Sequence, residues 1–382
     1  MRFITLLILV FSSFQALSMT VGADRKERYL PWLAGKRVAL VVNSTSMTSS
    51  GHLVDALLAE NIKVTKVFAP EHGFRIDQGA GTTINDNIDK QTGLPIVSLY
   101  GKTKKPTQDM LRDVDVIVFD IQDVGVRFYT YISTMHLVME AAAQFDKTVV
   151  VLDRPNPNGP YVDGPVLEAP FRSFVGKHPI PVLHGLTVGE LALMIKGENW
   201  INQSASLDLK VVPIADYTKA MPYSLPIAPS PNLPDDQAIA LYPSLCFFEA
   251  TAVSVGRGTP TPFRIFGHDT VPLGTFAFTP KSIPGKSLHP KLKGKQALGK
   301  DLSQYPAKGL TLRWLIEAQK AFSEQQKTLF TRPDFMDLLA GTDKLRKDIE
   351  SGLSESAIRA SWKQPLSQYR EQRKPYLLYP EQ

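Results

Sequence analysis

The stretch "RVALVVN" at residues 37–43 decides the fold of this chain. Five apolar residues follow one another in it, and such a run predicts a strand that is buried on both faces of a sheet. A second β-branched run, "KVTKVFA", lies at 63–69, and the stretch between the two runs, at 50–61, begins with serine and has helical periodicity. The order strand, helix, strand predicts two parallel strands joined by a crossover helix.

The same alternation continues to about residue 215. It predicts further strands at 95–101, 115–120, 148–153 and 207–214, and further helices at 107–114, 131–145 and 187–200. The residues that share the apolar face of the helix 131–145 are Ile132, Met135, Val138, Met139 and Ala142. The expected fold class is therefore α/β, with a doubly wound parallel sheet that helices cover on both faces.

The composition changes twice after this domain. The stretch 217–236 is rich in proline, which is incompatible with regular structure, and past 245 short strands such as "GTFAFTP" precede helices. The expected regions are a signal peptide at 1–18, the α/β domain at 28–215, a proline-rich crossing segment at 216–244 and a smaller α+β auxiliary domain at 245–382.

The N-terminus predicts export. Arg2 is followed by the apolar run "FITLLILVF" and then by Ala16-Leu17-Ser18, which is typical of a secretory signal and its cleavage site. The apolar run is short for a membrane span, so we expect a periplasmic or extracellular protein without stable membrane insertion after cleavage. The single cysteine, Cys246, allows no internal disulfide, and its apolar neighbours predict a buried structural thiol.

The charge balance bears on possible partners. The formal net charge is +6, and lysines cluster at 280–300 without the interleaved aromatic residues of a single-strand-binding surface. We therefore expect no nucleic-acid partner. A weakly basic surface suits an acidic polymer of the cell envelope, although a solvated charged face explains the lysines equally simply.

Polar residues gather where three of the predicted strands end. They are "PEHG" at 70–73, "DIQDVGVRFYTY" at 120–131 and "DRPNPNG" at 153–159. In an open parallel sheet, ligands bind beyond the carboxyl ends of the strands, because loops and helix N-termini converge there. The sequence therefore predicts a site at this rim of the sheet.

The first two stretches supply candidates for proton transfer. Partial burial would raise the pKa of Glu71 and make it a general acid, although a loop glutamate can instead cap a helix. His72 would orient Glu71 or the substrate, or serve only a structural role. In extended geometry, Asp120 and Gln122 project to one side and Asp123 to the other.

The remaining candidates suit an anionic sugar. Arg127, Tyr129 and Tyr131 occupy every second position, so in an extended chain their side chains project to the same side. They provide a cation and phenols for a sugar acid. Asp153 and Arg154 either contact the substrate or simply pair with each other.

Several cofactor motifs are absent from the sequence. No dinucleotide fingerprint, P-loop, G-x-S-x-G or H-E-x-x-H pattern occurs, so we expect neither a cofactor nor a zinc site. A hard-metal site built from Asp120, Asp123 and Asp153 would make the chain a metal-dependent phosphohydrolase, which is one alternative. The other alternative is a non-catalytic glycan-binding protein of the cell envelope that works through its basic auxiliary domain.

These stretches together resemble a known family, the exo-β-N-acetylmuramidases (NamZ/YbbC-like proteins) of bacterial cell-wall recycling. The motifs that carry the resemblance are "FAPEHGFR", "DIQDVGVRFYTYI", "VLDRPNPNG", "GLTVGELA", "PSPNLP", "YPSLCFFEAT" and "SVGRGTPTPF". The resemblance implies a Rossmann-like domain, an auxiliary domain and an active site in the cleft between them. It also implies removal of terminal N-acetylmuramic acid (MurNAc) from the non-reducing end of peptidoglycan fragments such as MurNAc-GlcNAc.

By position in the motifs, Glu71 is the proton donor that the resemblance implies. A glycosidase normally has a second carboxylate, for which we expect Asp123 first and Asp120 or Glu249 as reserves, unless the 2-acetamido group of the substrate attacks. Arg127 or Arg257 would bind the lactyl carboxylate of MurNAc. The motif residues Asn156 and Asn232 complete the expected substrate-binding set.

Overall fold

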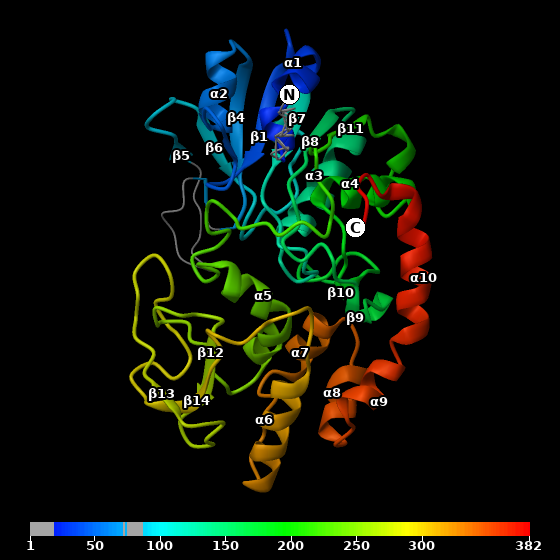
Figure 1. The fold of residues 1–382 in the computed structure, drawn as a ribbon. Coiled ribbons are helices and arrows are strands. Elements are labelled where there is room, and N and C mark those ends of the chain that lie inside the picture. The colour runs from blue at the N-terminus through cyan, green and yellow to red at the C-terminus, as the bar shows by residue number, and fades with distance from the viewer. Residues whose placement is uncertain (1–18, 72, 75–86) are drawn as a thin grey trace, which may run out of the picture.

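The computed structural model describes residues 19–71, 73–74 and 87–382, so the expected signal peptide and His72 lie outside the described residues. A seven-stranded sheet with the order β11-β8-β7-β1-β4-β6-β5 forms the centre of the N-terminal half (Figure 1). Its neighbours pair in parallel except β5 with β6. The strands are β1 (Arg37–Val42), β4 (Lys63–Ala69), β5 (Asn87–Ile88), β6 (Pro95–Ser98), β7 (Val116–Asp120), β8 (Thr148–Leu152) and β11 (Leu209–Val212). The predicted doubly wound α/β fold is confirmed.

Helices cover both faces of this sheet because its strands are apolar on both sides. Along β1, Val38 and Leu40 pack into one buried cluster and Ala39 and Val41 into another. The first cluster contains residues of α1 (Lys26–Leu33) and α2 (Leu53–Ala59), and the second contains residues of α3 (Tyr131–Gln144) and α4 (Val188–Gly197). All five residues of the predicted apolar face of α3 are buried.

Two predicted helices are shorter than the sequence suggested. The stretch 50–61 begins as the small hairpin β2 (Met47–Thr48) and β3 (Gly51–His52), and α2 starts only at Leu53. The His52 side chain replaces the expected serine as N-cap, because its Nδ1 accepts a hydrogen bond from Val54 N–H (3.3 Å). The stretch 107–114 contains only a 3₁₀ turn at Asp109–Leu111.

The second half of the chain begins with a helix that the sequence did not predict, α5 (Asp236–Leu245). This helix occupies the C-terminal part of the segment 216–244, which was expected to be irregular. Between β11 and residue 235 the chain forms no helix or strand. A three-stranded antiparallel sheet and further helices follow. They are β12 (Ile265–His268), β13 (Phe276–Phe278), β14 (Ala297–Asp301), α6 (Arg313–Glu324), α7 (Pro333–Ala340), α8 (Lys344–Glu350) and α9 (Glu355–Ala360).

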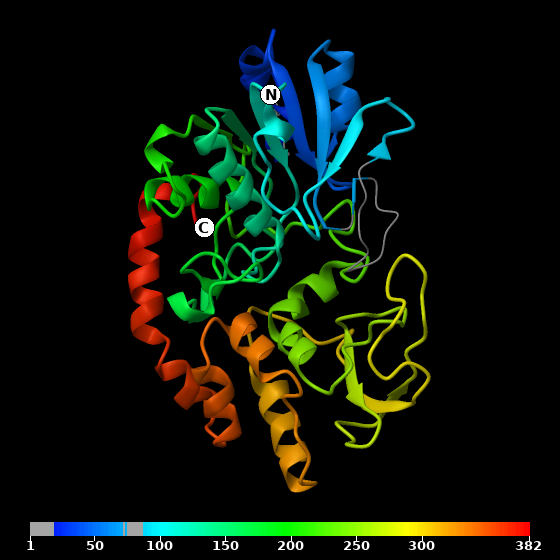
Figure 2. The same ribbon diagram turned by 180° about the vertical axis from the view of Figure 1, so that it is seen from behind.

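The last helix, α10 (Lys363–Arg373), returns to the N-terminal half (Figure 2). It lies near the hairpin β9 (Asp163–Val166) and β10 (Pro181–Leu183), and the hydroxyl of Tyr369 donates to the carbonyl of His184 (2.8 Å). Beyond the helix, Tyr379 donates to the carboxylate of Asp153 (2.5 Å). The chain thus ties its two halves together at its C-terminal end. Within the described ranges, no helix combines the length and the apolar character needed to cross a bilayer.

Two buried histidines, His136 on α3 and His178, predict a pH-dependent stability. His136 Nδ1 and His178 Nε2 lie 3.0 Å apart, and burial lowers the pKa of His178 well below its usual value and that of His136 to about 4. The unfolded chain binds protons at these histidines near pH 6.5, whereas the folded chain does not. The free energy of unfolding should therefore fall as pH drops below about 6.5, by up to about 1.4 kcal/mol per pH unit for each histidine.

Urea unfolding between pH 7.5 and 5 measures this slope. We expect His136→Gln to flatten the decline, and the exposed His289→Gln to leave it unchanged. An identical slope in the wild type and in His136→Gln would show that this histidine does not couple protonation to folding.

Candidate active site

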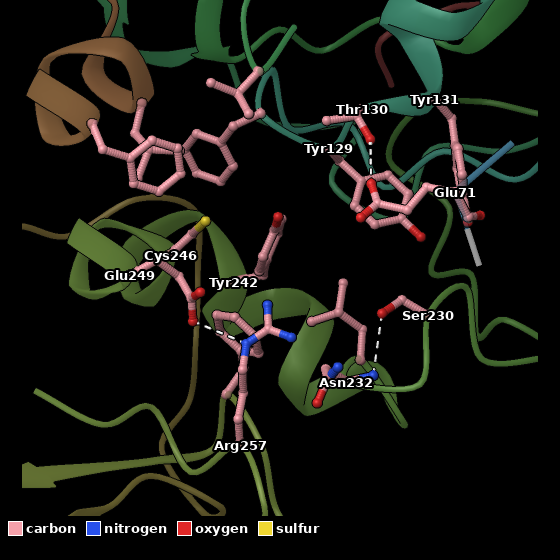
Figure 3. A pocket seen from close by; sticks show the side chains of 16 residues that line it. Glu71, Tyr129, Thr130, Tyr131, Ser230, Asn232, Tyr242, Cys246, Glu249 and Arg257 are labelled. Atoms are coloured by element: carbon pink, nitrogen blue, oxygen red, sulfur yellow. Dashed lines mark hydrogen bonds and ion pairs between the residues drawn. The ribbon is translucent and has the colours of Figure 1, made fainter. Parts of the chain in front are cut away.

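A pocket of about 200 Å³ lies between the rim of the sheet and the second half of the chain (Figure 3). Residues from both halves line it. They are Glu71, Phe128, Tyr129, Thr130, Tyr131 and Val175 from the first half, and Ser230, Asn232, Leu233, Tyr242, Cys246, Glu249, Arg257, Phe263, Phe335 and Leu339 from the crossing segment and the second half. The expected meeting of the loops after β4 and β7 at one rim is therefore observed at Glu71 and at residues 128–131.

Glu71 reaches the pocket because β4 ends in a tight turn. Gly73 N–H donates to the carbonyl of Pro70 (3.1 Å), and Gly73 has φ +84°, a conformation that favours glycine. The Glu71 carboxylate accepts a hydrogen bond from Thr130 Oγ1 (3.1 Å), and its backbone carbonyl accepts one from Tyr131 (3.2 Å). Two partners at the start of α3, its N-cap Thr130 and its first residue Tyr131, thus hold the glutamate at the pocket wall.

A tyrosine supports the same carboxylate from the β6 side. Burial raises the pKa of Tyr100, and the negative charge of the Glu71 carboxylate raises this pKa further. The Tyr100 hydroxyl therefore stays protonated close to Glu71.

The opposite wall carries an ion pair. Arg257 Nε donates to Glu249 (3.0 Å), and the guanidinium lies 5.1 Å from the centre of the Phe263 ring. Burial is the largest single effect and disfavours the charged guanidinium, but the charge and hydrogen bond of Glu249, together with smaller effects of Tyr242 and Cys246, raise the pKa of Arg257 overall. Figure 3 shows the other guanidinium nitrogens of Arg257 pointing into the pocket. This wall therefore presents a guanidinium that stays charged and is held in place by its carboxylate partner.

A half-buried lysine fixes the short helix that carries Glu249. This 3₁₀ helix, Cys246–Ala250, is followed by a turn, and Lys291 Nζ donates to the carbonyls of Phe248 (2.7 Å) and Thr251 (2.6 Å). The Phe248 carbonyl also accepts from Thr251 N–H (3.0 Å), so the ammonium adds a further bond at the end of this helix. Lys291 thereby fixes the position of the Glu249–Arg257 pair.

Aromatic side chains form much of the remaining surface. Tyr242 contacts Phe128 and Phe263 edge to face, with ring centres 5.3 and 5.1 Å away. Cys246 is buried among them, and burial, reinforced by Glu249, raises the pKa of its thiol, so the predicted burial of this thiol is confirmed. Aromatic rings next to hydroxyls and a cation provide the surfaces that a charged sugar requires.

Several residues expected at the site lie in buried networks outside the pocket lining. Arg154 pairs with Asp120 rather than with Asp153, through Nε–Oδ1 (2.5 Å) and Nη2–Oδ2 (2.8 Å) contacts. Asp153 accepts hydrogen bonds from Thr187 Oγ1 (2.7 Å), Gly189 N–H (2.8 Å) and Tyr379. These side chains fix the ends of β7 and β8.

Asp123 and its neighbours are buried in the same region. Asp123 is 4% exposed, accepts from Gly125 N–H (2.7 Å) and lies 3.6 Å from His184. Gln122 donates to the carbonyl of Asp123 (2.7 Å), and Asn156 donates to a backbone carbonyl of residue 186 (2.9 Å). None of the three lines the pocket, so the structure does not bring the preferred second acid to Glu71.

Arg127 also lies away from the pocket surface. Its guanidinium is fully buried and donates to four backbone carbonyls. It is therefore a structural cation, and of the two expected carboxylate-binding arginines only Arg257 faces the pocket.

The three aspartates proposed for a hard metal engage separate partners. Asp120 pairs with Arg154, Asp123 bonds to Gly125, and Asp153 bonds to hydroxyls and an amide. Across residues 19–71, 73–74 and 87–382, no group of three or more His, Cys, Asp or Glu side chains is placed to hold a metal ion. The arrangement gives no support to the phosphohydrolase alternative.

Thr130, Tyr100 and Ser230 were not among the residues expected at the site. Thr130 is the N-cap residue of α3 and already has helical backbone angles, so the extended alternation assumed for 127–131 does not hold there. The polar run "RFYTY" contained the signal, because a threonine between two tyrosines at a helix start turns toward the same rim.

The fold and the site together define a two-domain α/β protein with an aromatic, carboxylate-bearing pocket, which is a class of site suited to carbohydrate chemistry. The chain belongs to the exo-beta-N-acetylmuramidase NamZ family: the model of the N-terminal domain matches residues 38–237, and that of the C-terminal domain matches 240–379. The resemblance inferred from the motifs is thereby confirmed.

Relatives of known sequence or structure span nearly the whole chain. Peptidoglycan beta-N-acetylmuramidase NamZ of Bacillus subtilis (strain 168) is 39% identical over 377 residues, which cover 92% of this chain and 89% of the relative. A crystal structure of a DUF1343 family protein from Bacteroides fragilis has a TM-score of 0.86 and 44% identity, covering 96% of this chain and 100% of the other. A second one from the same organism has a TM-score of 0.81 and 30% identity, covering 94% and 99%.

Proposed function

We propose that this protein is an exo-acting glycoside hydrolase that releases terminal MurNAc from the non-reducing end of peptidoglycan fragments. The observation that carries the proposal is the pocket in which Glu71 lies on one wall and the charged Arg257 on the other. A small pocket walled by both halves of the chain suits a single terminal sugar. The named activity of the relative supports the same substrate.

Glu71 is the proton donor in this proposal. Its carboxyl group, in the protonated form, would give its proton to the glycosidic oxygen as the bond to the anomeric carbon breaks, water would supply the new oxygen at that carbon, and Thr130 would hold the side chain in position. Among the described residues that line the pocket, Glu249 is the other carboxylate. We assign it to orienting Arg257, because it accepts the Nε–H and leaves the terminal nitrogens for the substrate.

The decisive assay compares two chromogenic glycosides. The purified protein should hydrolyse the β-glycoside of MurNAc and leave that of N-acetylglucosamine (GlcNAc) nearly untouched, without added metal. Absence of turnover on the MurNAc glycoside and on a MurNAc-GlcNAc disaccharide would reduce the protein to a binding module.

Arg257 should set the preference for MurNAc over GlcNAc. The two sugars differ by a lactyl ether that carries a carboxylate, and its charge-assisted bond to a guanidinium contributes about 1.5–3 kcal/mol. Arg257→Gln should therefore lower the ratio of kcat/KM for the MurNAc glycoside to kcat/KM for the GlcNAc glycoside by about 10- to 150-fold. Arg264→Gln is the matched control, because Arg264 forms its ion pair with Asp235 outside the pocket lining. An equal loss on both glycosides would show that Arg257 does not read the lactyl group.

We further propose that the protein is exported. The apolar run after Arg2 and the small residues at 16–18 support this assignment, and an envelope location gives access to peptidoglycan fragments. Fractionation of cells that express the full chain, followed by mass determination of the N-terminus, tests both export and cleavage near residue 18.

A further inference from the structure

A second hollow of about 330 Å³ adjoins the pocket at the crossing segment. Its lining is mainly proline and small residues with one cation, and Ser230 belongs to both hollows. The lining residues are Ala228, Ser230, Pro231, Pro234, Pro284, Gly285 and Lys286. We call this hollow the proline groove.

A tight turn separates the proline groove from the pocket. Leu233 N–H donates to the carbonyl of Ser230 (3.0 Å), and Asn232 N–H donates to Ser230 Oγ (3.1 Å). Asn232 and Leu233 line the pocket, whereas Pro231 and Pro234 line the groove. The turn is therefore a thin wall with one face in each hollow.

Hydrogen bonds fix this wall at both ends. Tyr129 donates to the carbonyl of Pro229 (2.6 Å), which ties the turn to the loop that also holds Glu71. Asn232 Nδ2 donates to the carbonyl of Lys286 (3.2 Å), which ties it to the far side of the groove. The position of the groove relative to Glu71 is thus built into the fold.

We propose that the proline groove binds the sugar on the leaving-group side of the scissile bond, an N-acetylhexosamine. This inference rests on the proposed function. A general acid must reach the glycosidic oxygen, so the leaving sugar extends from the end of the pocket where Glu71 lies. Figure 3 shows Ser230 on the same side of the pocket as Glu71, with Glu249 and Cys246 on the other side.

The chemistry of the groove fits a neutral sugar. Proline rings present C–H surfaces that pack against the apolar face of a pyranose, and they lose little conformational freedom on binding. Ser230 and Lys286 supply polar groups for sugar hydroxyls or an amide carbonyl. The groove also gives a role to part of the lysine-rich stretch 280–300, which no motif explained.

Two substrates separate this groove from the catalytic pocket. A chromogenic MurNAc glycoside carries an aryl group in place of the second sugar, whereas the MurNAc-GlcNAc disaccharide fills both hollows. Ala228→Trp, which fills the groove, should lower kcat/KM on the disaccharide by about tenfold or more, mainly through KM, and change the chromogenic substrate by less than about twofold. The double variant Pro284→Ala/Lys286→Gln should lower kcat/KM on the disaccharide by about threefold. Lys293→Gln, at an exposed lysine, is the matched control.

The outcomes separate the two proposals. Equal losses on both substrates, or no loss on either, in both groove variants would overturn the assignment of the groove while leaving the hydrolase intact. A wild type inactive on both substrates would overturn the proposed function, and the groove assignment with it.

Discussion

Glu71→Gln is expected to lower kcat on the MurNAc-GlcNAc disaccharide by about 10²–10⁴-fold. Glutamine keeps the shape of the side chain and its contact with Thr130 Oγ1, but it has no proton to give to the leaving oxygen. KM should change little, because the substitution removes a transition-state role rather than a binding contact. Steady-state kinetics with detection of released MurNAc measures both parameters.

The leaving group provides an internal check of this role. A glycoside with an activated aryl leaving group needs little protonation, so Glu71→Gln should retain far more of its activity on that substrate than on the disaccharide. The exposed Glu60→Gln serves as the matched control for loss of a carboxylate. Near-wild-type turnover of the disaccharide by Glu71→Gln would remove Glu71 from the acid role.

The sheet was predictable from the sequence because a strand buried on both faces needs a continuous apolar run. The runs at 37–43, 63–69 and 148–153 correspond to β1, β4 and β8 nearly residue for residue. The hairpin at 47–52 has only two residues in each strand, so it leaves no periodic pattern to detect. The return of α10 was equally hidden, since it depends on contacts such as Tyr369 with His184 that are 185 residues apart.

The site was predictable as a place more than as a set of side chains. Parallel strands bring their carboxyl ends to one rim, so the loops after β4 and β7 had to meet, and Glu71 was found there. A polar residue at a strand end can face the ligand or support the loop, and the sequence does not distinguish these uses. Asp123 and Asp120 support the loops, whereas Glu249 and Arg257 reach the pocket from a helix and a turn of the second half.

Arg257 lies at the pocket and Arg127 does not, because their hydrogen-bond partners lie at very different distances along the chain. Arg257 meets Glu249 eight residues earlier in the chain, which keeps it beside the pocket. Arg127 instead meets carbonyls up to 213 residues away, and nothing local in the sequence indicates that α7 would pack against it.

Arg127→Met is expected to lower the free energy of unfolding by about 3–5 kcal/mol. In the wild type, Nη1 donates to the carbonyls of Pro165 (2.8 Å) and Ile180 (2.7 Å), and Nη2 to those of Leu339 (2.9 Å) and Ala340 (2.6 Å). Methionine fills a similar volume but leaves these buried carbonyls without a donor, and each orphaned group costs about 1–3 kcal/mol before relaxation. Arg127→Lys should recover little of the loss, because one ammonium cannot span two separate pairs of carbonyls.

The same substitution should loosen the pocket, because α7 carries Phe335 and Leu339 of its lining. KM should rise for both chromogenic glycosides by the same factor, since no contact with the lactyl carboxylate is removed. Urea unfolding together with kinetics on the two glycosides tests this, and Arg313→Met, at an exposed ion pair on α6, is the control. If Arg127→Met kept the stability of the wild type and lost only the preference for MurNAc, the structural role of the buried guanidinium would be refuted. Arg127 would then be a substrate-binding cation.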